Sequence, residues 1–137
     1  MRAASPSKTE RCPVCGMFVA GYSNWFAGVQ FKDGSHATFD GPKDLFKYLA
    51  AMKRYEKKRT DADLVATYVT DYYRVRPVDA RKAFYVTKSN VYGPMGEEYV
   101  PFENESDAAE FLRDHKGKKV LTFSEALAEV RALEAKP

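Results

Sequence analysis

The hydrophobic pattern in the first half of the chain predicts three short strands. Residues 24–31 (NWFAGVQF) form an apolar and aromatic run, and Asp33-Gly34 is typical of the tight turn that ends such a strand. Residues 35–39 then return as the second strand of a hairpin. Residues 64–69 (LVATYV) are β-branched and aromatic, which favours a third strand. The gap between the second and third strands is long enough to hold a helix.

The segment after residue 39 carries the signals of that helix. Asp40-Gly41-Pro42 is typical of a helix start, with Asp40 or Gly41 as the cap and Pro42 at the first helical position. The apolar residues that follow recur at three- and four-residue steps and would form one buried face: Leu45, Phe46, Leu49, Met52 and Tyr55. The pattern ends near Arg59.

The second half of the chain repeats this plan. One ungapped offset of 63 residues aligns core, acid and cap positions: Phe39 with Phe102, Asp44 with Asp107, and Gly41 with Asn104. Three apolar runs are the expected strands of the second half: 83–87 (AFYVT), 98–102 (EYVPF) and 119–123 (KVLTF). A last helix follows, capped by Thr122 with Glu125 or by Ser124.

The predicted architecture is therefore an α+β fold of two tandem ββαβ units with a C-terminal helix. The first unit spans residues 12–76, and the second unit with the helix spans residues 77–137. Residues 1–11 are polar, which predicts a disordered tail that leads into the first motif.

Three sulfur atoms lie close together near the start of the chain. Cys12, Cys15 and Met17 belong to the stretch CPVCGM and form a soft donor set. Thiolate and thioether ligands select Cu(I), with Zn(II) as the competitor for thiolates, whereas Mg, Ca and Mn prefer oxygen. These residues are predicted to bind a metal ion, and Cu(I) is favoured.

The turn of the second hairpin is enlarged and contains a fourth sulfur. The first hairpin turns at Asp33-Gly34, whereas the second uses residues 88–96 (KSNVYGPMG) for the same reversal. Met95 lies there between Pro94 and Gly96. An apolar thioether at a loop tip is costly to expose unless something covers or binds it. We therefore include Met95 in the predicted metal site.

Two other roles remain open for the cysteine pair. A closed zinc site takes four ligands, usually in two pairs of Cys or His, and His36 or His115 would have to complete it. His115 aligns with the inward-facing Met52, which favours a packing histidine, and His36 is uninformative. A redox couple of the thioredoxin type would place CxxC between a strand and a helix, whereas here it follows a polar tail.

Composition narrows the class of protein further. The chain has 137 residues, of which 45% are hydrophobic, enough for one domain or two very small ones. A formal charge of +3 is too small to favour nucleic acid binding, and the basic cluster in residues 53–59 complements the end of the predicted helix.

No apolar run approaches the roughly 18 residues of a membrane span. Residues 1–11 lack the apolar core of a signal peptide, so a cytoplasmic protein or a trimmed mature form is expected.

Several motifs together resemble the nitrous oxide reductase accessory protein family, NosL. The shared elements are CPVCGM at 12–17, the hairpin and helix start at Phe39-Asp40, Asp79-Ala80 with AFYV at 83–86, GPMG at 93–96 and VPF at 100–102. The resemblance runs from about residue 11 to residue 125. The pairing of CxxCGM with GPMG is its specific part.

The resemblance implies a periplasmic lipoprotein that binds Cu(I) and delivers copper for assembly of nitrous oxide reductase, the enzyme of denitrification, or of another periplasmic copper enzyme. Its partner would be that client or an assembly factor. It implies Cys15, Met17 and Met95 as ligands, with Cys12 as a fourth. The segment 9–11 before Cys12 is no lipid-attachment sequence, so membrane contact would need an anchor that is absent from this chain.

The resemblance also implies ββαβ units of a kind shared with organomercurial lyase, which makes a thiol-dependent organometal lyase-like enzyme a further alternative. Such an enzyme needs two thiolates and a carboxylate. Here both cysteines lie in one motif, and the sequence marks no carboxylate as their partner. No Ser-His-Asp or Cys-His arrangement with recognisable spacing is present either. We therefore expect a binding protein rather than an enzyme.

Overall fold

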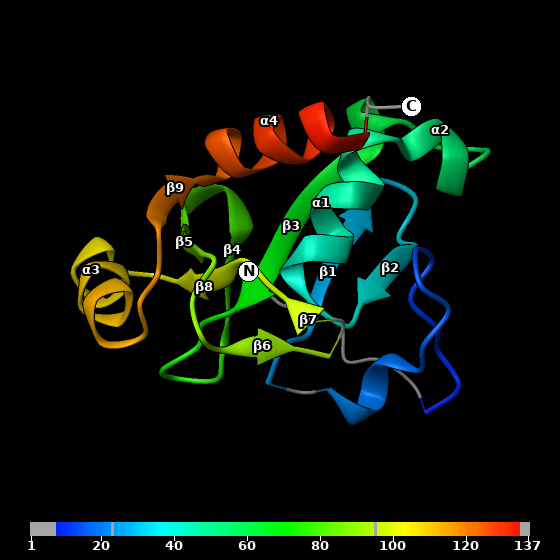
Figure 1. Cartoon of the computed structure of the whole chain (residues 1–137). Coiled ribbons are helices and arrows are strands. Elements are labelled where there is room, and N and C mark those ends of the chain that lie inside the picture. The colour runs from blue at the N-terminus through cyan, green and yellow to red at the C-terminus, as the bar shows by residue number, and fades with distance from the viewer. Residues whose placement is uncertain (1–7, 23, 95, 135–137) are drawn as a thin grey trace.

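The first of the two larger antiparallel sheets has the strand order β2-β1-β3-β4 (Figure 1). The computed structural model describes residues 8–22, 24–94 and 96–134. The strands of this sheet are β1 Ala27–Phe31, β2 His36–Phe39, β3 Leu64–Thr70 and β4 Pro77–Asp79. The predicted hairpin is present, and Gly34 at its turn has a φ of +88°. β1 begins later than predicted, at Ala27, because its partner Phe39 is the last residue of β2 before the chain turns into a helix.

The helix after β2 begins as predicted but is broken. α1 spans Pro42–Ala50 with Gly41 as its cap, and α2 spans Met52–Tyr55, so the helix does not continue to Arg59. At the break, the rings of Tyr48 and Tyr55 stack with centroids 6.1 Å apart. Residues seven apart in a continuous helix would be separated by roughly 10.5 Å along the axis. The break thus allows an aromatic stack that a straight helix would not.

The second sheet has the strand order β8-β5-β9. Taken in chain order, its strands β5, β8 and β9 occupy the same relative positions as β1, β2 and β3 in the first sheet. Its elements are β5 Phe84–Thr87, β8 Val100–Phe102, α3 Glu105–Asp114, β9 Lys119–Thr122 and the C-terminal helix α4 Phe123–Glu134. Asn104 caps α3, and Thr122 and Glu125 exchange the hydrogen bonds of a capping box at α4. Both predicted caps are confirmed.

The enlarged turn between β5 and β8 contains a small ribbon of its own. β6 Tyr92–Gly93 pairs with β7 Gly96–Glu97, and Gly93 lies opposite Gly96 in the register. We call this ribbon the GPMG hairpin. Met95, which we predicted as a ligand, falls between the two strands and lies outside the described residues.

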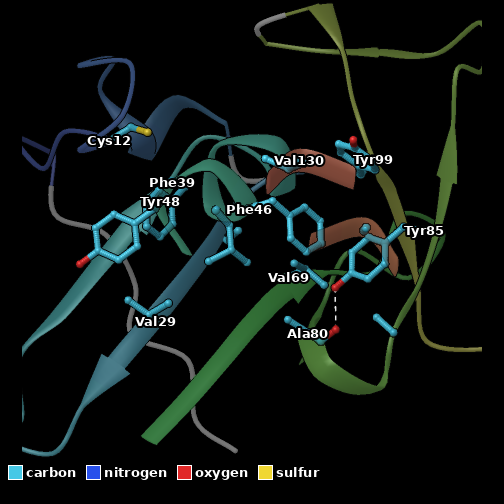
Figure 2. Packing of buried hydrophobic residues seen from close by; sticks show 14 of the residues in the cluster. Cys12, Val29, Phe39, Phe46, Tyr48, Val69, Ala80, Tyr85, Tyr99 and Val130 are labelled. Atoms are coloured by element: carbon cyan, nitrogen blue, oxygen red, sulfur yellow. Dashed lines mark hydrogen bonds between the residues drawn. The ribbon is translucent and has the colours of Figure 1, made fainter. Parts of the chain in front are cut away.

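Both halves of the chain contribute to the main hydrophobic core. Figure 2 shows Phe46 of α1 beside Tyr85 of β5, whose ring centroid lies 5.1 Å away, with Val69 and Val130 nearby. The same phenylalanine lies 5.4 Å from the ring of Tyr99. α1 and α4 also pack against each other. The observed fold is mixed, with helices and antiparallel sheets, as predicted. None of the helices in the described segments has the length and apolar character to cross a bilayer.

Candidate metal site

Residues 10–19 fold into a tight loop, here called the metal loop, that holds both cysteines. The Cys12 N–H donates to the Met17 carbonyl at 2.8 Å, and the Gly16 N–H donates back to the Cys12 carbonyl at 2.9 Å. Gly16 has a φ of +79°, a conformation that residues with a side chain rarely adopt. The CPVCGM stretch is therefore fixed as a turn by its own backbone.

The turn places the two thiols against two carboxylates. Sγ of Cys15 lies 3.0 Å from Oδ2 of Asp40, and Sγ of Cys12 lies 3.5 Å from Oδ2 of Asp44. One ligand atom from each of these four residues lies within 4.8 Å of the others, and we call this group the Cys/Asp cluster. Asp40 follows β2 directly and Asp44 lies in the first turn of α1. A loop, a strand end and a helix start thus converge on one cluster.

The cluster is buried on one side and reachable on the other. Cys12 is 1% exposed and belongs to the hydrophobic core, where Figure 2 shows it on the side of Phe39 and Tyr48. Asp40 and Asp44 are buried as well. Cys15 is only half-buried. An incoming ion would therefore meet Cys15 first.

Burial shapes the protonation of the metal-free cluster. Desolvation raises the pKa of Cys12, although the backbone N–H groups of Cys15 and Val14 favour its thiolate. Burial also raises the pKa of Cys15, and the hydrogen bond to Asp40 raises it further because that bond favours the protonated thiol. The pKa of Asp40 is raised too, first by burial. A bound metal ion would therefore have to displace protons from this cluster.

The structure brings together two of the four sulfur residues that we predicted as ligands. Cys12 and Cys15 lie side by side in the Cys/Asp cluster. Met17 follows in the same loop, is half-buried, and directs its backbone N–H at the Cys15 sulfur. Met95 lies outside the described residues. The role of both methionines stays a prediction.

Sequence reasoning missed Asp40 and Asp44 as members of the site. Both had a simpler interpretation, because a carboxylate at the start of a helix commonly caps it or complements its dipole. Asp107, the second-half residue that aligns with Asp44, has an ordinary surface role: its carboxylate accepts a 2.8 Å hydrogen bond from Arg74. The sequence did contain one signal for Asp40. His36, Thr38 and Asp40 alternate along β2 and just past its end, so their side chains lie on the same face of the strand.

A buried glutamate ties the GPMG hairpin to the start of α1. Oε1 of Glu98, the residue after β7, accepts the Lys43 N–H at 2.6 Å and the Tyr99 N–H at 2.9 Å. A Cβ on Gly41 would collide with the Glu98 carboxylate, and one on Gly93 would lie 3.1 Å from its Cγ. The base of the hairpin therefore packs tightly on the first turn of α1, which carries Asp44.

The two histidines lie apart from the Cys/Asp cluster. His115 stacks on Phe111 with ring centroids 4.4 Å apart and places Nδ1 3.0 Å from Oδ1 of Asn90, so it is a packing histidine, as predicted. His36 places Nε2 3.2 Å from Oε1 of Glu10. Within the described part of the chain, the group of side chains that are close enough to bind one metal ion includes neither histidine.

An α+β fold that holds two thiols and two carboxylates in one cluster defines a protein with a candidate site for a thiophilic metal ion. The chain belongs to the NosL family, whose family model matches residues 3–130. This result confirms the family that the CxxCGM and GPMG motifs indicated.

Comparison with a crystal structure agrees with this assignment at the level of the fold. The crystal structure of the copper chaperone NosL from Shewanella denitrificans superposes with a TM-score of 0.73 at 24% sequence identity, covering 90% of this chain and 94% of that one. The solution structure of the apo-NosL protein from Achromobacter cycloclastes gives a TM-score of 0.44 at 24% identity, covering 72% of this chain and 82% of that one. The search of curated proteins gave no match.

Proposed function

We propose that the protein is a copper chaperone that binds one Cu(I) ion through the thiolates of Cys12 and Cys15. The observation that carries the proposal is the convergence of these two sulfurs in one cluster at the edge of the core. Met17 and Met95 are the proposed thioether ligands that complete the site. Membership of the NosL family, to which the copper chaperone from Shewanella denitrificans also belongs, supports copper as the cargo.

The donor chemistry favours the cuprous ion. Thiolates and thioethers are soft ligands that Cu(I) prefers, whereas carboxylates suit harder ions. Asp40 and Asp44 then act as acceptors that hold the thiol protons while the site is empty. When copper binds, those protons leave and the sulfurs become ligands.

The uneven burial of the two thiols suits transfer rather than storage. Cys12 is anchored in the core, while Cys15 is half-buried and open to an approaching partner. An acceptor thiolate could replace Cys15 first while Cys12 still holds the ion. Such stepwise exchange allows tight binding together with rapid release.

For Met95, support comes from the residues that bracket it. The GPMG hairpin is held on the first turn of α1 by Glu98, and Asp44 of the Cys/Asp cluster lies in that same turn. A hairpin anchored there is suited to bring a thioether toward the thiols. This geometry favours one site built from both halves of the chain.

The proposed client is nitrous oxide reductase or another periplasmic copper enzyme. This part of the proposal follows from membership of the family that the motifs resemble. Because the family resemblance implies a periplasmic lipoprotein, we also propose that the chaperone works in the periplasm, attached to the membrane in its full-length form.

A competitive Cu(I) titration of the reduced protein tests the proposal. We expect one equivalent of Cu(I) to be taken from a competing chelator. Cys15→Ser should weaken binding by more than about a hundredfold, and Met17→Leu or Met95→Leu by about threefold to tenfold, because each removes a soft ligand. Met52→Leu, a change to a buried methionine in α2, is the matched control. Undiminished affinity in Cys15→Ser would overturn the proposal.

The two carboxylates favour a second candidate, a zinc-binding module. Two thiolates and two carboxylates would supply the four ligands of a tetrahedral Zn(II) site. Under this alternative, protein purified under reducing conditions would hold one equivalent of zinc. That zinc would resist Cu(I) and would be unaffected by Met17→Leu and Met95→Leu. Displacement of zinc by one equivalent of Cu(I) would favour the chaperone.

A further inference from the structure

The metal loop is attached to β2 at a point outside the Cys/Asp cluster. One oxygen of the Glu10 carboxylate lies 3.2 Å from Nε2 of His36, and the other accepts a hydrogen bond from the Thr38 hydroxyl. His36 and Thr38 are two residues apart on β2 and share one face of the strand. The next position on that face is Asp40, which receives the Cys15 thiol. The loop therefore lies along one face of β2, with Glu10 at one end and Cys15 at the other.

The backbone transmits this attachment to the cysteines. The Glu10 carbonyl accepts the Val19 N–H at 3.1 Å, and the next pair of residues, Arg11 and Phe18, forms an antiparallel bridge. These contacts close the base of the metal loop, and Cys12 follows immediately after the bridge. Any displacement of Glu10 along β2 would consequently shift the turn that carries both sulfurs.

The strengths of the two attachments differ. A thiol is a weak hydrogen-bond donor, so the Cys12 and Cys15 contacts with the aspartates hold the loop loosely. A carboxylate bound by a hydroxyl and an imidazole makes stronger, charge-assisted bonds. Thr38 is fully buried, and the Glu10 side chain is only 21% exposed, so water competes little for the bond between them. Of these two sets of hydrogen bonds, the one that Glu10 makes with His36 and Thr38, here called the clasp, is therefore the stronger.

We propose that Glu10 is a positioning residue for the metal site, which clasps the metal loop on His36 and Thr38 and so presets the two sulfurs for Cu(I). This inference rests on the proposed function. A loop ordered before binding loses less conformational freedom when the ion binds, which increases affinity. The Glu10 carboxylate bonds to His36 and Thr38 of β2, so the clasp acts on the two cysteines through the loop.

The test measures Cu(I) affinity, Cu(I) release and thiol reactivity in clasp variants. Glu10→Ala and Thr38→Val should each weaken Cu(I) binding by about tenfold with unchanged stoichiometry. The double variant should lose little more than Glu10→Ala alone, because Glu10→Ala already removes the bond that Thr38→Val deletes. Release of Cu(I) to a chelator and alkylation of Cys15 in the apo protein should both accelerate. Glu10→Gln, which keeps one acceptor oxygen, should restore most of the affinity.

The controls separate positioning from a general loss of stability. Glu103→Ala removes an exposed carboxylate that pairs with Arg76 elsewhere on the surface, and it should change neither affinity nor alkylation. Affinity and alkylation rates in Glu10→Ala equal to those of the parent would overturn the inference. If Glu10→Ala fails to fold by circular dichroism, Thr38→Val decides the outcome alone. Failure of the proposed function looks different, because Cys15→Ser would then bind Cu(I) as the parent does.

Discussion

Burial, supported by Asp40 and Asp44, sets the protonation of the metal-free site. Burial raises the pKa of both thiols above the ordinary value, and the aspartates that accept these thiols raise it further, so the cysteines stay protonated. Protonated thiols oxidise and exchange slowly, since the thiolate is the reactive form. The empty site is thereby protected, and its affinity for Cu(I) should rise with pH as the thiol protons become easier to displace.

Asp40→Asn tests this role at one carboxylate. The substitution removes the acceptor that favours the protonated Cys15, so the pKa of Cys15 should fall while burial still keeps it raised. At about pH 8 the apo protein should be alkylated at Cys15 at least about threefold faster than the parent. Asp107→Asn, which changes the second-half residue that aligns with Asp44, should leave the rate unchanged. A slower or equal rate in Asp40→Asn would contradict the assignment.

The sequence could identify the sulfur residues but not the carboxylates opposite them. Cys12 and Cys15 are scarce residues at a spacing that has few structural uses. Asp44 and Asp107 occupy equivalent positions at the starts of similar helices, yet one receives a buried thiol and the other pairs with Arg74. What separates them is the loop that packs on the first helix, and that contact joins residues far apart along the chain.

The GPMG hairpin is an addition to the second half that has no counterpart in the first. Its base is fixed by Glu98, whose pKa is raised to about 8, chiefly by burial and partly by Asp44, although the N–H groups of Tyr99 and Lys43 favour the charged form. The folded protein therefore holds the Glu98 proton more tightly than the unfolded chain does. The hairpin and the first turn of α1 are coupled through a carboxyl group that is neutral over much of the accessible pH range.

Glu98→Gln tests this coupling through the pH dependence of stability. Since the folded pKa lies above the unfolded value of about 4.3, the folded state binds more protons between about pH 4.3 and pH 8, and the parent should lose stability as pH rises through that window. Glutamine keeps the acceptor oxygen without a charge. Urea unfolding at about pH 5 and about pH 8.5 should show a smaller decline for Glu98→Gln than for the parent. The exposed neighbour Glu97→Gln should decline as the parent does, and equal declines in all three proteins would refute the coupling.

At the level of helices and strands, local sequence signals predicted most of what the structure contains. Gly41 and Asn104 occupy the N-cap positions of their helices, and Thr122 with Glu125 forms the predicted capping box, because helix starts depend on residues that are neighbours in the chain. The break at Ala51 could not be foreseen, since alanine favours helices and the stacking of Tyr48 on Tyr55 that accompanies the break has no local sequence signal. The ribbon formed by β6 and β7 was missed because its strands are only two residues long.

Across the whole molecule, the two halves share one core, and this packing fixes the GPMG hairpin relative to the metal loop. The ring of Phe46 contacts Tyr85, Tyr99 and Phe123 of the second half, with centroids 5.1, 5.4 and 5.5 Å away. Periodicity indicated that Phe46 faces a core but not which residues complete it, because such contacts leave no local pattern. The relative placement of the halves therefore had to come from the structure.

X-ray absorption at the copper edge of the protein loaded with one equivalent of Cu(I) tests the central claim most directly. The account predicts a first coordination shell of sulfur atoms, with fewer sulfur scatterers in Cys15→Ser and in Met95→Leu and an unchanged shell in Met52→Leu. A shell of oxygen or nitrogen atoms alone, identical in the parent and in Cys15→Ser, would contradict it.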